Sequence, residues 1–359
     1  MNIKNKLLLI PKDFIPTFEN WRVEGVFNPG VIRLSDKRII LYVRVAESVV
    51  DGKGLQRTCP VIISDKNYKV YYSHVSKKKI LDRGKQVTFL KGSICRLNTI
   101  SHFRRVWLRE DGFQVEKIEE IPAFVGTPGC GDFGVEDPRI VKINGSYIMT
   151  YVSVSLHEGV CTSLAISKDL KNWDKKGIIF RQQNKDVVIF PEKINNEYVA
   201  LHRPEGTMNF SKKSIWISHS RDLIYWGKEK SILRARSGSW GSDWVGSGPP
   251  PFKTKKGWLL IYHGVRTIKN KNIYSVGAAL LDLKNPLKVI ARTPINRPLI
   301  KPKEEYEKNG FINDVIFPTG LVEDLDKKHI LLYSGGADRI TTVKKLNLNE
   351  ILDSLQEVT

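Results

Sequence analysis

The stretch SKDLKNW at residues 167–173 returns as SRDLIYW at residues 220–226, with Ser, Asp, Leu and Trp in matching places. Each copy reads as a strand end, a polar turn that carries Asp, and a Trp that packs back on the strands. Weaker copies stand at residues 64–68 (SDKNY) and 281–286 (LDLKNP). A repeat of about 50 residues that holds several strands is typical of a β-propeller blade.

The rest of the chain has the composition of short strands. Runs rich in β-branched and aromatic residues alternate with turn residues, for example at 39–43, 147–152, 258–262 and 330–333. Helical patterns are confined to residues 348–355 and a short segment around Tyr306. No low-complexity linker divides the chain. We therefore predict an all-β protein in which residues 1–359 form a single five-bladed β-propeller with a central axial active-site pocket.

The net charge and the hydropathy of the chain indicate whether nucleic acid or a membrane is an expected partner. The net charge is +20, but the lysines are scattered, and neither a recognition helix nor an RNA-binding aromatic motif accompanies them. We therefore expect no nucleic-acid partner, although a positive field can attract a small anionic substrate. No apolar run reaches the roughly 18 residues of a membrane span. The expectation is a cytoplasmic protein without a membrane partner.

The four cysteines are far apart and form no CxxC pair. This spacing argues against a zinc site and against a disulfide framework, so we expect buried thiols and no metal.

Polar clusters stand at strand ends about one blade apart. The most distinctive is GVEDPR at residues 134–139, in which proline fixes φ and arginine can hold a carboxylate. Alone, EDPR is also explained by a strand-entry turn with a local Asp/Arg pair. The other clusters are FNPG (27–30) with Arg44, NKD (184–186), FPEK (190–193), LHRP (201–204), GSGPP (246–250), YHG (262–264) and GGAD (335–338).

The sequence resembles glycoside hydrolase family 130, the β-mannoside phosphorylases and β-mannosidases, in the ordered set FNPG, GVEDPRI, FPEKI, LHRP, GPPP, YHGV, LLDL and GGAD. The resemblance spans residues 27 to about 338. It implies a five-bladed β-propeller with Asp137 as the catalytic acid and inorganic phosphate, not a cofactor, as co-substrate. The phosphate contacts that it implies are Lys185, Arg203, Tyr262 and His263. The mannose contacts that it implies are Asn28, Arg44 and Asp338, and Glu136 is open between sugar binding and scaffold.

The residue types favour phosphorolysis. An inverting hydrolase needs a second carboxylate to activate water, whereas phosphate is already an anion and needs cationic donors to hold it. We expect the pKa of Asp137 to be raised by burial or by Glu136, and Arg139 to point away and secure the turn. By the resemblance, the proton passes through a substrate hydroxyl, and inverting attack on a β-mannoside gives α-mannose 1-phosphate.

Two other functions remain open, a β-mannosidase of the same family and a non-catalytic carbohydrate-binding propeller. For the linkage, the loop SVSLHEGV at residues 153–160 resembles that of β-1,2-acting members and favours β-1,2 over β-1,4 mannosides. His157 in this loop is a candidate sugar contact, and a solvated hairpin turn explains it equally well. The oligomeric state stays open between a monomer and a homo-oligomer.

Overall fold

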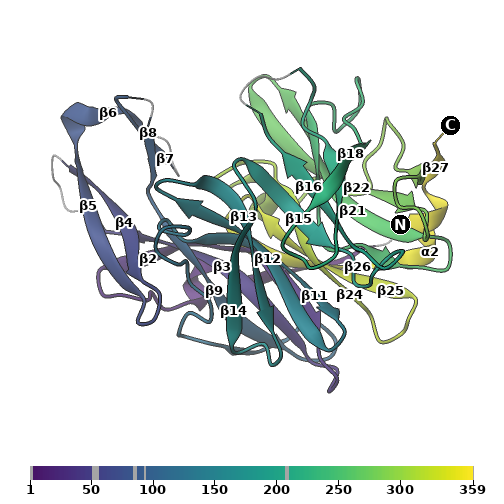
Figure 1. Cartoon of the computed structure of the whole chain (residues 1–359), viewed down its shortest axis with the longest axis horizontal. Coiled ribbons are helices and arrows are strands. Elements are labelled where there is room, and N and C mark those ends of the chain that lie inside the picture. The colour runs from purple at the N-terminus through teal and green to yellow at the C-terminus, as the bar shows by residue number, and fades with distance from the viewer. Residues whose placement is uncertain (1–2, 51–55, 84–86, 93, 207–209, 359) are drawn as a thin grey trace.

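The computed structural model describes residues 3–50, 56–83, 87–92, 94–206 and 210–358. It has the predicted all-β fold, and Figure 1 shows the strands gathered into several twisted sheets. The predicted helices are both present as short elements, α1 (Glu305–Lys308) and α2 (Leu348–Asp353). No helix in the described ranges is long and apolar enough to cross a bilayer.

The first three large sheets are antiparallel and have four strands each, with the lowest-numbered strand at one edge. Sheet one contains β2 (Trp21–Arg33), β3 (Ile39–Val49), β9 (Ile100–Leu108) and β10 (Val115–Ile118). Sheet two contains β11 (Val135–Ile143), β12 (Ser146–Ser155), β13 (Gly159–Ser167) and β14 (Trp173–Phe180). Sheet three contains β15 (Asn184–Ile189), β16 (Tyr198–Pro204), β17 (Ile215–Ser220) and β18 (Gly227–Leu233).

The last two large sheets draw on both ends of the chain. Sheet four contains β19 (Trp244–Ser247), β20 (Phe252–Lys253), β21 (Trp258–Ile268), β22 (Lys271–Leu281), β23 (Val289–Arg292) and β27 (Gln356–Glu357). Sheet five contains β24 (Ile316–Glu323), β25 (His329–Gly336), β26 (Ile340–Asn347) and β1 (Lys4–Leu9). Because β1 pairs with β26, the N-terminal strand completes a sheet whose other strands come from the C-terminal end.

The hydrophobic core lies between successive sheets. Separate clusters of buried side chains join sheet one to sheet two, two to three, three to four and four to five. A fifth cluster joins sheet five to sheet one, where Tyr333 of β25 and Val343 of β26 pack with Val26 of β2. Burial of apolar area in these layers is the main stabilising contribution, at about 25 cal/mol per Å².

The repeated turn lies where the sequence predicted, between the third and fourth strands of a sheet. The Asp169 carboxylate accepts the backbone N–H groups of Lys171 and Asn172, each at 2.8 Å. Asp222 and Asp282 cap the corresponding turns of sheets three and four in the same way. The Trp173 indole N–H donates to Tyr42 Oη at 3.1 Å, so this tryptophan fills the space between sheets two and one, as predicted.

One predicted copy of the repeat is wrong. Residues 64–68 join β4 (Gln56–Ser64) to β5 (Lys69–Ser76), which form a two-stranded sheet outside the five large ones. The turn that corresponds in sheet one carries Asp111, whose carboxylate accepts the N–H groups of Phe113 and Gln114. The sequence spacing misled because an excursion separates β3 from β9, which are neighbours in the sheet.

The excursion continues from β5 into 3₁₀ helix η2 (Lys77–Lys79) and a second small sheet. That sheet consists of β6 (Ile80–Arg83), β7 (Val87–Leu90) and β8 (Ile94–Leu97). In Figure 1 these elements stand at the end of the molecule opposite the two termini. A further 3₁₀ helix, η1 (Pro11–Asp13), follows β1.

Candidate active site

The GVEDPR corner forms a β-bulge at the start of β11. Glu136 pairs with Val152 and Arg139 with Thr150, so the register shifts between them. Asp137 lies in this shift with φ of +51°, a backbone conformation that Asp tolerates better than most residues. A Cβ on the preceding Gly134 would lie 2.3 Å from the Ser101 carbonyl oxygen, so only glycine allows this close packing. The bulge changes the direction in which the Asp137 side chain points from β11.

The same device recurs in the first strands of sheets one and three. Asn28 has φ of +50° within a register shift of β2, and Asp186 has φ of +57° within one of β15. Three polar side chains are thus directed by bulges at corresponding places in successive sheets. Strained backbone of this kind, held in place by the surrounding fold, is common at functional sites.

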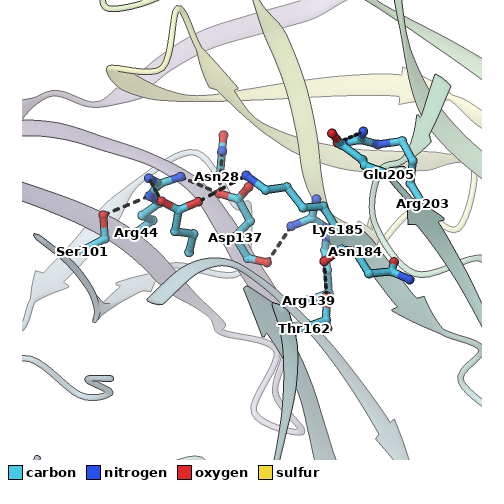
Figure 2. Close-up of polar contacts among 11 residues, drawn as sticks. Asn28, Arg44, Ser101, Asp137, Arg139, Thr162, Asn184, Lys185, Arg203 and Glu205 are labelled. Carbon is cyan, nitrogen blue, oxygen red and sulfur yellow. Dashed lines mark hydrogen bonds and ion pairs between the residues drawn. The ribbon is translucent and has the colours of Figure 1, made fainter. Parts of the chain in front are cut away.

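Asp137 is held by two donors from sheet one. Its Oδ1 accepts Nδ2 of Asn28 at 2.8 Å and Nη1 of Arg44 at 3.1 Å. Figure 2 shows these three side chains converging, with Lys185 reaching toward them from β15. Arg44 also donates through Nη2 to Glu136 at 2.7 Å and through Nε to Ser101 at 3.1 Å. The guanidinium of Arg44 therefore fixes both carboxylates of the EDPR corner.

The expected rise in the pKa of Asp137 is wrong for the arrangement of protein groups around it. Burial opposes ionisation, but the charges of Arg44 and Arg139 and the hydrogen bond from Asn28 outweigh it. The pKa of Asp137 is consequently held below its ordinary value. Arg139 secures the turn as expected, since it donates to the Asp137 carbonyl at 2.9 Å and to that of Gly248 at 2.7 Å.

A second charged group is built around Arg203 on β16. Its Nε donates to Asp186 at 2.6 Å, and its Nη1 donates to Glu205, as Figure 2 shows for the latter pair. Burial opposes ionisation of Asp186, yet nearby positive charge, chiefly that of Arg203, holds the pKa of Asp186 at about 2. His263 Nε2 lies 3.7 Å from the same carboxylate, and burial lowers the pKa of His263 to about 4. His263 is therefore a neutral imidazole at pH 7.

These groups open onto one cavity of about 600 Å³. Nine of the ten residues singled out in the sequence line it, which are Asn28, Arg44, Glu136, Asp137, His157, Lys185, Arg203, His263 and Asp338. Among the lining residues, four positive side chains (Arg44, Arg96, Lys185 and Arg203) balance four carboxylates (Glu136, Asp137, Asp186 and Asp338). The charge of +20 is therefore not concentrated here, and anion binding must depend on the placement of individual cations.

Comparison with known proteins places this geometry in a family. A family model described as β-1,4-mannooligosaccharide phosphorylase matches residues 110–357. The chain belongs to glycoside hydrolase family 130. A relative from Listeria innocua, named β-1,2-mannobiose phosphorylase, is 34% identical over 97% of this chain and 96% of its own. A 1,2-β-oligomannan phosphorylase of Thermoanaerobacter is 43% identical over 61% of this chain and 70% of its own.

Solved structures of family 130 extend the similarity to the fold. The structure of the Listeria innocua β-1,2-mannobiose phosphorylase in complex with β-1,2-mannobiose matches with a TM-score of 0.89. The match covers 99% of both chains at 34% identity. A family 130 structure whose description concerns glycoside hydrolases that target β-1,2 mannosidic linkages matches with a TM-score of 0.69 at 22% identity, which supports the fold alone.

Tyr262 is the predicted site residue that the structure places elsewhere. Alternation along β21 puts His263 on the cavity side and Tyr262 on the other, where it is fully buried against Trp240. Its Oη accepts Nε of Arg292 at 3.1 Å. The tyrosine that lines the cavity is Tyr274 of β22, which packs 6.0 Å from His263 between ring centroids. The structure of this family 130 chain therefore places Tyr262 outside the cavity wall and Tyr274 within it.

The remaining residues that line the cavity are difficult to recognise from the sequence. Asp186 stood within the NKD cluster without a role, and Tyr274 lies outside the polar clusters that the sequence singled out. Arg96 comes from β8 of the excursion, and its guanidinium stacks 5.8 Å from the Phe133 ring centroid. His157 is exposed in the turn between β12 and β13 and borders the cavity. These contacts depend on which strands pair, which sequence spacing does not reveal.

In the described ranges, one group of side chains has the spacing of metal ligands, namely Asp324, Asp326 and His329. Lys345 forms ion pairs with both aspartates, and none of these residues lines the cavity.

Proposed function

We propose that this protein is an inverting phosphorylase that cleaves β-1,2-linked mannosides with inorganic phosphate and releases α-mannose 1-phosphate. The observation that carries the proposal is the single cavity in which Asp137 is accompanied by cationic Lys185 and Arg203. The β-1,2 linkage rests on the names of the relatives from Listeria innocua and Thermoanaerobacter. Neither a metal nor an organic cofactor takes part in the proposed reaction.

The pairing of Glu136 and Asp186, two of the other three cavity carboxylates, favours phosphate over water as nucleophile. An inverting hydrolase needs a free carboxylate as base on the face opposite the acid. Here Glu136 accepts from Arg44 at 2.7 Å and lies 3.8 Å from Lys185, and Asp186 accepts from Arg203. Carboxylates tied to arginine are weak bases, because the adjacent positive charge stabilises their ionised form. Phosphate brings its own negative charge and needs no such base.

Lys185, Arg203 and His263 are the proposed phosphate contacts. Lys185 is a mobile point charge, whereas Arg203 is fixed by two carboxylates and supplies directed N–H donors. His263 is neutral and fully buried, so its ring N–H can donate without adding charge. We assign Tyr274 to the same cavity as a hydroxyl donor in place of Tyr262. Asn28, Arg44, Glu136, Asp338 and His157 are the proposed sugar contacts.

Proton delivery requires that Asp137 be protonated when the substrates are bound. A mannoside that expels water from the cavity and a phosphate dianion near Lys185 both disfavour the ionised carboxylate. Both would raise the pKa of Asp137 from the lowered value that Arg44, Arg139 and Asn28 impose. The family resemblance adds that the proton travels through a substrate hydroxyl, which allows Asp137 to remain bonded to Asn28 on the sugar side.

We further propose that the five sheets are the blades of a five-bladed β-propeller formed by residues 1–359 as one domain. Core clusters between each pair of successive sheets, including sheet five and sheet one, support this arrangement. The first strands of the five sheets all supply cavity residues, which are Asn28, Asp137, Lys185, Trp244 and Phe317. Such convergence is what a central axial pocket requires.

The experiment is to incubate the purified protein with β-1,2-mannobiose and β-1,4-mannobiose, each with and without phosphate. We expect mannose 1-phosphate from the β-1,2 substrate, and only when phosphate is present. Mannose release at the same rate without phosphate would replace the proposal with a β-mannosidase. A preference for β-1,4-mannobiose would overturn the linkage alone.

A further inference from the structure

Glu205 contacts the proposed phosphate ligand Arg203 but is not one of the described residues that line the cavity. It follows the last residue of β16, and its backbone N–H donates to the Gln183 carbonyl at 2.8 Å. The carboxylate is divided between two cations, since one oxygen accepts Nη1 of Arg203 and the other accepts Nζ of Lys213 at 2.6 Å.

Lys213 ties this group to the neighbouring sheet. Its backbone carbonyl accepts the N–H of Val245 at 3.2 Å, and its ammonium group lies 5.4 Å from the ring centroid of Trp244. Both residues belong to β19 of sheet four, whereas Arg203 belongs to sheet three. Trp244 lines the cavity and packs edge-on against Tyr274, another lining residue. The Lys213–Glu205–Arg203 series therefore spans the junction between two sheets and ends at the cavity.

The geometry leaves Arg203 little freedom. Asp186 accepts its Nε and Glu205 accepts its Nη1, and within the described part of the chain no group bonds to its Nη2. Among the described residues, Nε and Nη1 of Arg203 are thus bonded to carboxylates, and Nη2 is the guanidinium nitrogen that can donate to a ligand. Because guanidinium is planar, fixing two nitrogens also fixes the direction of the third.

We propose that Glu205, held by Lys213, is a positioning residue that aims Arg203 at phosphate and so sets the affinity of the enzyme for its co-substrate. This inference rests on the proposed phosphorylase function. Lys213 also keeps the Glu205 charge neutralised, which limits its repulsion of the incoming anion. Arg203 and Lys213 hold the pKa of Glu205 below its ordinary value against the opposing effect of burial, so the pair is ionised at neutral pH.

Two effects compete when Glu205 is changed to Gln. Loss of the negative charge favours phosphate, whereas loss of the ion pair loosens Arg203 and weakens phosphate binding. The second effect dominates, because Lys213 already offsets the charge while a hydrogen bond between charged groups is among the stronger ones. We expect Glu205→Gln to raise the KM for phosphate about tenfold, and to change kcat at saturating phosphate and the KM for β-1,2-mannobiose by less than about twofold.

The partner lysine provides a second, independent variant. Lys213→Met leaves Glu205 charged but removes the cation that holds its carboxylate in place, so Glu205 no longer fixes the position of Arg203. We expect this variant to raise the KM for phosphate by a similar factor. Lys213→Arg keeps the cation and should restore the wild-type value. The double variant Glu205→Gln/Lys213→Met should resemble either single variant, because residues that act as one unit give non-additive effects.

A matched control lies at the other end of β16, at the residue before the strand begins. Glu197 is bonded to Lys228 at 2.7 Å, its side chain is 19% exposed against 15% for Glu205, and it does not line the cavity. Glu197→Gln should leave all kinetic constants unchanged. Thermal unfolding of each variant checks that the fold persists.

The outcomes separate the inference from the function on which it rests. The wild-type protein could require phosphate while Glu205→Gln and Lys213→Met both keep the wild-type KM for phosphate. That result would overturn the positioning role alone. Equal loss of kcat and of affinity for both substrates, without rescue by Lys213→Arg, would also overturn it and indicate a structural role. A wild-type protein that needs no phosphate would instead overturn the proposed function.

Discussion

At the scale of single residues, the site is governed by how carboxylates are shared among cations. Arg44 holds Glu136 and Asp137 together, and Arg203 holds Asp186 and Glu205. The neighbouring cations hold the pKa values of Asp137, Asp186 and Glu205 below their ordinary values. Under the proposed mechanism, bound substrates must therefore raise the pKa of Asp137 before it can act as an acid.

Asp137→Asn should abolish phosphorolysis without unfolding the protein. The amide preserves the shape and can still accept a hydrogen bond from Asn28, but it cannot donate and recover a proton. We expect kcat to fall by about 10² to 10⁴, the usual contribution of a general acid. Steady-state kinetics measures this loss, with Asp174→Asn at an exposed surface ion pair as control. Retention of more than a tenth of the wild-type kcat, about a 1.4 kcal/mol change in barrier, would reject Asp137 as the acid.

The two tyrosines offer a paired test of the corrected assignment. Tyr274→Phe removes a hydroxyl from a side chain that lines the cavity and should raise the KM for a substrate severalfold. Tyr262→Phe removes the acceptor for Arg292 in the core and should cost about 1 kcal/mol of unfolding free energy with unchanged kinetics. The opposite pattern in kinetics and urea unfolding would restore Tyr262 to the site.

At the scale of elements, bulges and turns decide which side chains meet. The repeated Ser-x-Asp-Leu turn could be predicted from sequence because its hydrogen bonds are local, as at Asp169 and Asp222. The clusters FNPG, EDPR and NKD were also visible, since Asn, Asp, Gly and Pro mark unusual backbone. The position of Tyr274 and the excursion from β4 to β8 could not be predicted, because both depend on pairing between distant strands.

Gly246 on β19 tests how closely the elements must approach. A Cβ at this position would lie 2.2 Å from Oδ2 of Asp186 and 2.5 Å from Cε1 of His263. Gly246→Ala should therefore displace both groups and reduce kcat/KM for phosphate by about tenfold or more, a cost expected from small misplacements near a reacting centre. Gly227→Ala, with open space around its added Cβ, is the matched control and should behave as wild type. Wild-type kinetics for Gly246→Ala would contradict the observed packing.

At the scale of the whole molecule, buried neutral histidines link stability to pH. Burial lowers the pKa of His202 and of His263 to about 4, and that of His102 well below its ordinary value. Each histidine stays neutral in the folded protein while the unfolded chain takes up a proton below about pH 6.5. The unfolded state therefore binds more protons between pH 6.5 and 4, and stability rises with pH across this window.

Urea unfolding between pH 4.5 and 7.5 should show this linkage. We expect the free energy of unfolding to decrease as pH falls below about 6.5, with at most about 1.4 kcal/mol per pH unit for each histidine. Above pH 7 the histidine contribution should be constant. A free energy that does not change between pH 7 and 5 would contradict the burial of neutral imidazoles in the core and site.

The all-β fold could be predicted because short strands and local turns follow one another along the chain, whereas the cavity could be predicted only in part because strands from five separate sheets line it. The central claim is that phosphate, and not water, attacks the mannoside from the face that inverts the anomeric centre. Proton and phosphorus NMR of the protein with β-1,2-mannobiose and phosphate measures this directly. The account predicts α-mannose 1-phosphate and mannose in equal amounts from the start of the reaction. Formation of β-mannose 1-phosphate, or of mannose alone at a rate independent of phosphate, would contradict it.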